Sequence, residues 1–345
     1  MKSITRVSLL GALLGVLLLP QFARADWAIS RGEDYDAEID LRGIAFLDDD
    51  TGWAVGDKGT ILHTVDGGHT WEPQAMPEPS ADVEERFRNR MKSAQLVRVL
   101  IADESTVWIL GNGVLLGSTD AGATWRYSNA GTRNRLTNGV FLSAEIGFIV
   151  GDNRTIVGTW DGGGTWESVF EGRRARAGDN RTVYEAIAFM TPDIAWIVGS
   201  SSTVVRSEDG GRNWAQPDGI DFDAYGNVYG VTFLSETEGW AVGQEAMILH
   251  TTDAGEYWEP VENDAENFGY DLKDFAFSED GSQAWVVGDG GTILHTSDGG
   301  ETWPAEESSV NHDLKAVAVT PSGTAYVVGA WGVILQSAPT GIAGN

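Results

Sequence analysis

The chain of 345 residues contains no cysteine. Disulfides, catalytic thiols and thiolate metal sites are therefore excluded, which leaves five histidines and the carboxylates as possible metal ligands. Basic residues are also scarce, since 23 Lys and Arg stand against 51 Asp and Glu and give a net charge of −28. Phosphate binding needs a net basic surface, so this composition excludes nucleic acid as a general partner.

Long apolar runs are absent beyond the first 25 residues, so we expect no membrane-spanning helix in the mature protein. The first 25 residues themselves are expected to be a signal peptide. Lys2 and Arg6 are followed by an apolar run over residues 7–19 and by a small-x-small cleavage site ending at Ala25. Cleavage there predicts a mature protein of residues 26–345 that is periplasmic or secreted. An uncleaved membrane anchor is the alternative.

Glycine and tryptophan are abundant, with 44 and 14 residues, and both recur in a repeated pattern. Six similar segments each end in a tryptophan: TVDGGHTW at Trp71, STDAGATW at Trp125, TWDGGGTW at Trp166, SEDGGRNW at Trp214, TTDAGEYW at Trp258 and TSDGGETW at Trp303. Upstream of each lies an aromatic residue followed by small and branched residues and a glycine, as in WAVG at Trp53, and a seventh copy, YVVG, begins at Tyr326. A period of ~40 to 50 residues with several short strands per unit is typical of a β-propeller.

Each unit contains four expected strands, which in the first unit are residues 41–47, 52–56, 60–64 and 70–73. We therefore predict an all-β, seven-bladed propeller of four-stranded blades that forms a single domain over residues 26–345.

The seventh unit ends after three expected strands and has no closing tryptophan. Residues 26–29, which include Trp27, have the strand propensity to supply the missing fourth strand. Closure of the ring by this N-terminal strand would remove the two exposed sheet edges of a split ring.

The repeated aspartates and tryptophans are predicted to be structural, because a residue that recurs in six units serves what the units share. The aspartate accepts backbone N–H bonds in its own turn, glycine supplies positive φ, and the tryptophan covers the turn. These residues are Asp66, Trp71, Asp120, Trp125, Asp161, Trp166, Asp209, Trp214, Asp253, Trp258, Asp298 and Trp303. The same reasoning applies to His63, His250 and His295 in the repeated ILHT strand. Acidic loops such as residues 218–223 show no ordered ligand spacing, so no metal or cofactor is predicted.

The turn pattern S/T-x-D-x-G-x-T-W is similar to the Asp-box, or bacterial neuraminidase repeat, of sialidases, other glycosidases and sortilin-type receptors. The fuller pattern at residues 52–71 and 285–303 resembles the photosystem II assembly and stability factor family of cyanobacteria and chloroplasts, which has relatives in non-photosynthetic bacteria. The resemblance covers residues 27–337. It implies a non-catalytic protein-binding scaffold or assembly factor whose client is a membrane protein or its acidic segment.

Arginines cluster in one part of this acidic chain. Thirteen of the 23 basic residues lie between Arg86 and Arg181, in a window with nine acidic residues. In a propeller, blade connections and turns between second and third strands emerge on one face, so these arginines are expected on one face of the second to fourth units. The resemblance implies a docking surface there, for which we select Arg86, Arg88, Arg90, Arg133, Arg135, Arg154, Arg173, Arg174, Arg176 and Arg181. The alternative is that they are solvated loop charges.

An Asp-box glycoside hydrolase, sialidase-like or endoglucanase-like, is the alternative function. A sialidase requires an arginine triad and a tyrosine paired with a glutamate. The Arg-Ile-Pro motif of that family is missing, and Tyr184, Tyr225 and Tyr229 lie in no recognisable pairing with glutamate. No Ser/His/Asp arrangement or phosphate-binding loop is present either, so we do not predict an enzyme.

Overall fold

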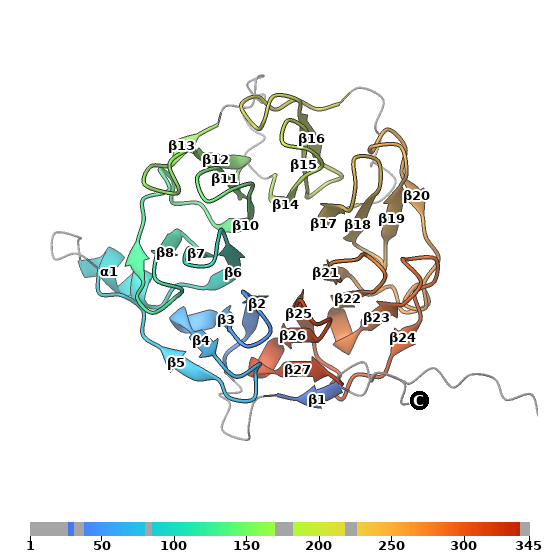
Figure 1. The fold of residues 1–345 in the computed structure, drawn as a ribbon, viewed down its shortest axis with the longest axis horizontal. Helices are drawn as coiled ribbons and strands as arrows, with labels where there is room; N and C mark the ends of the chain where they lie inside the picture. Colours follow the sequence, from blue (N-terminus) through green and yellow to red (C-terminus); the bar gives the residue numbers. More distant parts are fainter. Residues whose placement is uncertain (1–26, 31–37, 80–84, 170–181, 218–225, 339–345) are drawn as a thin grey trace, which may run out of the picture.

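The computed structural model describes residues 27–30, 38–79, 85–169, 182–217 and 226–338. In these ranges, antiparallel strands form seven sheets that stand as blades around a central channel (Figure 1). The predicted seven-bladed, all-β propeller is therefore confirmed. Residues 1–26 lie outside the described residues, so the signal peptide and its cleavage at Ala25 remain predictions.

Within each blade the strands run from the channel to the rim in sequence order. The inner strands are β2 (Leu41–Phe46), β6 (Leu96–Ile101), β10 (Leu136–Phe141), β14 (Tyr184–Phe189), β17 (Val228–Phe233), β21 (Leu272–Phe277) and β25 (Leu314–Val319). The second strands are β3 (Gly52–Gly56), β7 (Val107–Gly111), β11 (Gly147–Gly151), β15 (Ala195–Gly199), β18 (Gly239–Gly243), β22 (Ala284–Gly288) and β26 (Ala325–Gly329). The third strands are β4 (Ile61–Thr64), β8 (Val114–Ser118), β12 (Thr155–Thr159), β16 (Val204–Ser207), β19 (Ile248–Thr251), β23 (Ile293–Thr296) and β27 (Ile334–Ser337).

The outer strands are short: β5 (Glu72–Gln74), β9 (Arg126–Tyr127), β13 (Glu167–Ser168), β20 (Glu259–Pro260), β24 (Ala305–Glu306) and, in blade seven, β1 (Trp27–Ile29). In the fourth blade the outer segment makes only one bridge, between Arg206 and Ala215. Pro217 follows it and has no N–H to extend the ladder.

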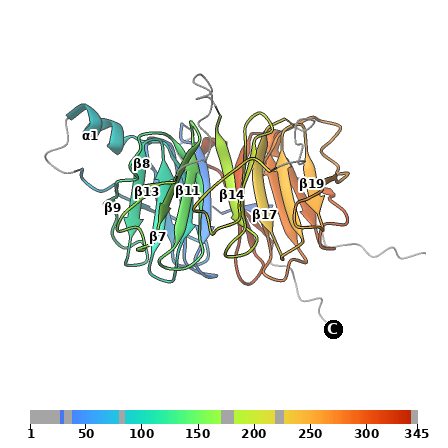
Figure 2. The ribbon, with the colours of Figure 1, turned by 90° about the horizontal axis from the view of Figure 1, so that it is seen from above.

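The two ends of the ring differ in their loops. One end carries the connections between blades and the turns between second and third strands, including the 3-10 helices η1 (Asp57–Gly59), η2 (Asp289–Gly291) and η3 (Ala330–Gly332). We call this end the connection face and the other the Asp-box face. The helix α1 (Glu85–Lys92) lies in the connection between the first and second blades and stands at the rim of the ring (Figure 2). No helix in the described part of the chain is long and apolar enough to cross a bilayer.

Strand β1 closes the ring, as predicted. It pairs antiparallel with β27, with Trp27 opposite Ser337. The Trp27 indole is 8% exposed, and its Nε1 donates a hydrogen bond to Glu306 Oε2 in the sixth blade at 2.7 Å. The N-terminal strand therefore joins blade seven to blade six as well as completing the sheet.

The Asp-box turn is held by a fixed set of hydrogen bonds. In the first blade, Asp66 Oδ1 accepts the Thr70 N–H at 2.8 Å and Asp66 Oδ2 accepts the Thr70 hydroxyl at 2.7 Å. The Thr64 hydroxyl donates to Asp66 and accepts the Gly68 N–H. These hydrogen bonds from Thr70 and Thr64 lower the pKa of Asp66 to about 2. The backbone bond to the equivalent carboxylate recurs at Asp120, Asp161, Asp209, Asp253 and Asp298.

Neighbouring blades are joined through these turns. The glycine two residues after each Asp-box aspartate lies against the aromatic ring of the preceding blade's second strand, as Gly163 lies against Trp108. The closing Trp166 then meets Trp108 edge to face, with ring centroids 5.4 Å apart. The buried clusters likewise consist of residues from two adjacent blades, so the core lies between blades.

We expect Gly163→Ala to destabilise the protein more than Gly323→Ala, although both glycines have φ near +85° (84° and 86°). A Cβ at Gly323 meets nothing within 4 Å, so only left-handed strain of about 1–2 kcal/mol is expected. A Cβ at Gly163 would stand 2.0 Å from the Trp108 ring, which should add about 1–3 kcal/mol of overpacking. Urea unfolding measures the free energy of unfolding of each variant. Equal losses of stability would argue against the glycine–aromatic contact as the interaction that joins neighbouring blades.

A mature chain that starts at Ser30 should melt at a lower temperature than one that starts at Asp26, because blade seven loses β1 and its edge becomes exposed. Limited proteolysis should cut first in residues 314–337. Thermal unfolding with mass-spectrometric mapping of the cuts checks this, and an equally stable truncated protein would show that β1 does not close the ring in solution.

Candidate functional site

The channel contains a charged cavity of about 390 Å³ at the connection face, to which the inner strands of all seven blades contribute side chains. Each inner strand has a β-bulge directly after its first residue. A bulge re-aims a side chain, and here the bulged residue of every blade lines the cavity. The seven residues, in blade order, are Arg42, Val97, Thr137, Glu185, Tyr229, Lys273 and Lys315.

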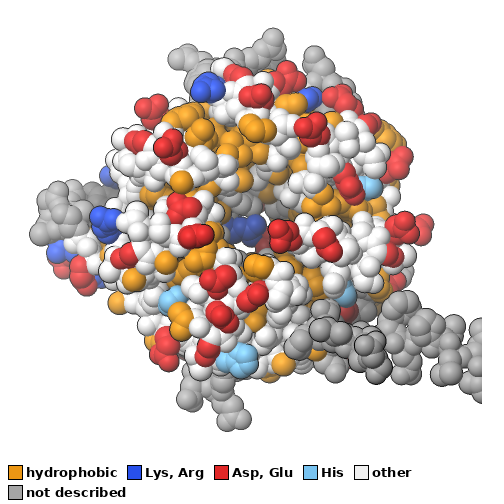
Figure 3. Space-filling model, in the orientation of Figure 1, with side chains coloured by type: hydrophobic (Ala, Val, Ile, Leu, Met, Phe, Trp, Pro, Cys, Tyr) orange, Lys and Arg blue, Asp and Glu red, His pale blue; other side chains and the backbone are white. Residues whose placement is uncertain are grey.

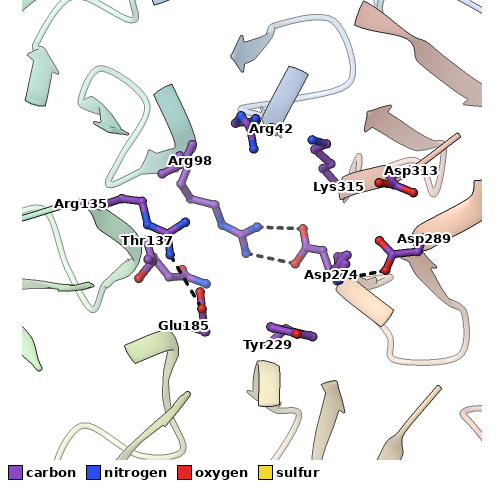
Figure 4. A pocket seen from close by; sticks show the side chains of 13 residues that line it. Arg42, Arg98, Arg135, Thr137, Glu185, Tyr229, Asp274, Asp289, Asp313 and Lys315 are labelled. Carbon is purple, nitrogen blue, oxygen red and sulfur yellow. Dashed lines mark hydrogen bonds and ion pairs between the residues drawn. The ribbon is translucent and has the colours of Figure 1, made fainter. Parts of the chain in front are cut away.

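An ion pair crosses the channel below this ring of side chains (Figure 4). Arg98 of the second blade donates to Asp274 of the sixth, with Nη1–Oδ2 at 2.8 Å and Nη2–Oδ1 at 3.3 Å. Asp274 is 8% exposed and also accepts the Val317 N–H at 3.2 Å. A second cavity of about 260 Å³ shares both residues of the ion pair and is otherwise lined by uncharged residues. The Arg98–Asp274 pair therefore borders both cavities of the channel.

Charge is unevenly distributed around the cavity. Its basic residues are Arg42, Arg98 and Arg135 of blades one to three and Lys273 and Lys315 of blades six and seven. Its acidic residues are Glu185 of blade four and Asp274, Asp289 and Asp313 of blades six and seven and their connection. Along the ring axis, basic side chains are visible in the central opening, and acidic side chains are spread over the surrounding blades (Figure 3). The arginines of the mouth thus lie on blades one to three, which we call its cationic side, whereas three of the four lining carboxylates lie on blades six and seven and their connection.

Each basic side chain of the mouth is held by a carboxylate. Arg42 Nε lies 2.7 Å from Asp57 Oδ1, and Lys315 Nζ lies 2.6 Å from Asp40 Oδ2. Arg135 Nε lies 3.1 Å from Asp152 Oδ1. These pairs fix the orientation of the guanidinium and ammonium groups, so the cationic side is preorganised.

Glu185 differs from Asp274 among the channel carboxylates in having no close basic partner in the described part of the chain. Burial raises its pKa, and its basic partner Arg135 is distant, with Nη2 at 3.9 Å from Oε1. The positive charge of Arg135 opposes the effect of burial without cancelling it.

The arginines selected from the sequence lie in three places. Arg86, Arg88 and Arg90 belong to α1. Arg133 and Arg135 lie just before β10, the inner strand of the third blade. Arg154 lies in the turn after β11, which packs on this segment through the Asn153 Nδ2–Asn134 Oδ1 hydrogen bond at 3.1 Å. Arg173, Arg174, Arg176 and Arg181 lie outside the described residues. The docking role of the whole set remains a prediction.

The repeated histidines stack on the tryptophans of the second strands, with centroid distances of 5.0 Å for His63–Trp53, 4.0 Å for His250–Trp240 and 4.4 Å for His295–Trp285. Burial lowers the pKa of His63. Among the residues that the structure describes, no three His, Asp or Glu side chains are grouped so as to hold a metal ion.

Of the channel residues, sequence reasoning selected Arg135 and missed the others. Their signal is a polar or charged residue in second place of an otherwise apolar inner strand, as in LRGIAF, YEAIAF and LKDFAF. In a regular strand, alternation of side chains explains such a residue as facing solvent. Only the β-bulge directs it into the channel.

We expect Glu185→Gln to stabilise the protein at neutral pH. Because the pKa of Glu185 is raised in the folded state, its ionisation costs stability as the pH rises above about 4.5, the ordinary value. Glutamine removes that cost, so the gain should appear above this pH and vanish below it. Urea unfolding from pH 3.5 to 8 measures it, with the exposed Glu167→Gln as a control; a pH-independent effect would contradict the assignment.

Sequence comparison identifies relatives of known family. The family model described as "Photosynthesis system II assembly factor YCF48" matches residues 22–134, 174–269 and 262–338. The photosystem II stability/assembly factor HCF136 of Oryza sativa is 36% identical over 125 residues, which cover 33% of this chain and 28% of that protein. The photosystem II assembly lipoprotein Ycf48 of Synechococcus is 28% identical over 155 residues, covering 44% and 42%. The matched part thus spans less than half the length of these relatives.

Solved propellers share the fold. YCF48 from Cyanidioschyzon merolae superposes with a TM-score of 0.69 at 21% identity, covering 92% of this chain and 99% of that one. A structure described as YCF48 bound to D1 peptide gives 0.68 at 18% identity, with 92% and 96% covered. A xyloglucanase from Xanthomonas campestris gives 0.65 at 16%, covering 90% and 53%, so similarity at this level shows the architecture alone. The family match, by contrast, extends over most of the chain, and the protein belongs to the photosystem II assembly factor YCF48 family.

Proposed function

We propose that this protein is an exported, non-catalytic docking platform that binds an acidic segment of a membrane-protein client during its assembly. Membership of an assembly factor family supports the role, and one related structure is described as bound to D1 peptide. The name of the Synechococcus relative, a lipoprotein, supports export.

The observation that carries the proposal is the cationic side of the connection face. We call Arg42, Arg98, Arg133, Arg135 and Arg154 the cationic sector. Arginine forks bind carboxylates bidentately, as Arg98 already does with Asp274. A client carboxylate would be received by guanidinium groups that are already oriented, which reduces the entropy lost on binding.

The proposed surface extends outward along α1, which holds the selected Arg86, Arg88 and Arg90. The helix stands at the rim of the same face, and η1 of the first blade hydrogen-bonds to its C-terminal flank through Gly59 N–Ala94 O at 2.8 Å. An extended segment could therefore run from the channel mouth to α1.

The absence of catalysis is part of the proposal. A glycosidase requires one carboxyl group to donate a proton and another to act as base or nucleophile. Asp271 and Asp289 flank Lys273 Nζ at 2.9 and 3.2 Å, and Asp274 is bound by Arg98, so these carboxylates already serve as ion-pair partners. Turnover of chromogenic glycosides by the purified protein would contradict this part.

The docking surface is tested by reversing two charges in the cationic sector. Arg133→Glu with Arg154→Glu should weaken binding of a labelled D1 peptide, or of another acidic peptide, by about tenfold or more, because two attractive charges become repulsive. The matched control is Arg126→Glu with Arg212→Glu, which changes the total charge equally at exposed positions in the outer strand β9 and in the Asp-box turn of the fourth blade. Fluorescence anisotropy measures both, and equal weakening in the two variants would overturn the placement of the site.

A further inference from the structure

Three large aromatic side chains are exposed on the connection face, in blade seven and in the connection between blades five and six. Phe268 and Tyr270, in the connection between blades five and six, are 67% and 40% exposed. Their rings are stacked on each other, with centroids 5.9 Å apart and planes inclined by 9°. Trp331, in η3 of blade seven, is 54% exposed. Exposed aromatic rings with polar surroundings are characteristic of interaction surfaces.

Trp331 is the least expected of the three, because its backbone lies in the left-handed region at φ 60°. The equivalent turn position is Gly290 in the sixth blade and Lys58 in the first. A bulky residue in this conformation is costly for the fold, and half of the indole is not buried. The His312 ring, 4.9 Å from it and inclined by 47°, is its described ring neighbour. Neither turn geometry nor core packing therefore accounts for a tryptophan here.

Hydrogen bonds and contacts join these rings into one surface. The Tyr270 ring lies against η2, where a Cβ on Gly290 would stand 2.9 Å from it. Gly290 N donates to Asp313 Oδ1 at 3.1 Å, and Asp313 adjoins His312. We call Phe268, Tyr270 and Trp331, with the carboxylates of Glu245, Asp289 and Asp313 between and beside them, the aromatic arc.

The aromatic arc is negatively charged. Glu245 and Asp313 are exposed, and neither forms an ion pair with another residue in the described ranges. Lys273 is shared between Asp271 and Asp289. Burial raises the pKa of Asp289, and the charges of Asp313 and Asp271 raise it further against the effect of Lys273. An additional positive charge at this surface would therefore be stabilised by carboxylates that now repel one another.

We propose that the aromatic arc is a second docking surface, distinct from the cationic sector, which binds a basic segment of a partner protein. Lysine or arginine side chains of the segment would lie over the exposed rings and pair with Glu245 and Asp313. Ring faces attract such cations, and the adjacent carboxylates add a Coulombic contribution. The proposal is independent of the docking of an acidic client, because it uses residues that are not part of the cationic sector. The two surfaces adjoin at Asp40, which accepts the Trp331 N–H at 3.2 Å and lies 3.5 Å from Arg42.

The first test replaces Trp331. The probe is a fluorescein-labelled peptide of alternating arginine and serine with acetylated and amidated ends, and anisotropy at physiological salt gives its affinity. Trp331→Gly should weaken binding roughly threefold to thirtyfold, the range expected for loss of a cation–π contact. It should leave the melting temperature unchanged or raise it, since glycine favours positive φ.

Tyr257→Ala is the matched aromatic control, because Tyr257 is 63% exposed but belongs to an Asp-box turn. Its affinity for the basic peptide should equal that of the unmodified protein. Equal affinities of all three proteins would overturn the assignment of Trp331.

The second test removes charge. Glu245→Gln with Asp313→Asn should weaken binding of the same peptide and flatten its salt dependence, while Glu145→Gln with Glu236→Gln, an equal charge change in exposed turns of the Asp-box face, should not. Equal loss in both variants would overturn the proposal in favour of diffuse attraction to an acidic protein.

If sedimentation shows self-association that Trp331→Gly abolishes, a second copy occupies the arc and the proposal also fails. Binding of the acidic peptide should be unchanged in every arc variant, which separates this test from that of the cationic sector.

Discussion

The propeller depends on one repeated contact, in which a glycine of each Asp-box lies against an aromatic ring of the preceding blade. The contact requires positive φ and the absence of a Cβ on one side, and a large flat ring on the other. Because the aspartate fixes the turn through its own hydrogen bonds, the glycine is presented at the same place in each of the six blades that have an Asp-box. The aspartate, the glycine and the tryptophan recur together because they form one interblade joint.

This joint explains why the architecture was predictable. The period, the number of units and the missing fourth strand of the seventh unit are all visible in the repeated turn, and the free aromatic strand at Trp27 fits the vacant position. A feature that all seven blades share, such as the second strand, is repeated seven times in the sequence and is therefore easy to recognise. The weak outer segment of the fourth blade is an exception, in which Pro217, a residue without an N–H, follows the single bridge.

The candidate site was predicted only in part, because function resides where the blades differ. The clustering of arginines could be recognised in the sequence. The side chains that line the channel depend on a β-bulge, and no residue type in the sequence indicates where a bulge occurs. The crossing of Arg98 and Asp274 joins residues of opposite blades, and nothing in their local sequences relates them. The exposure of aromatic residues such as Trp331 could not be predicted either, because the aromatic residues of the repeat are expected in the core.

The pairing of β1 with β27 joins segments about three hundred residues apart in the chain, so it has the largest loop-closure entropy of any strand pair in the fold. The other blades are built from local hairpins and can form as the polypeptide emerges. The ring can therefore close only after both β1 and β27 have been synthesised. A chain that lacks either strand cannot complete blade seven.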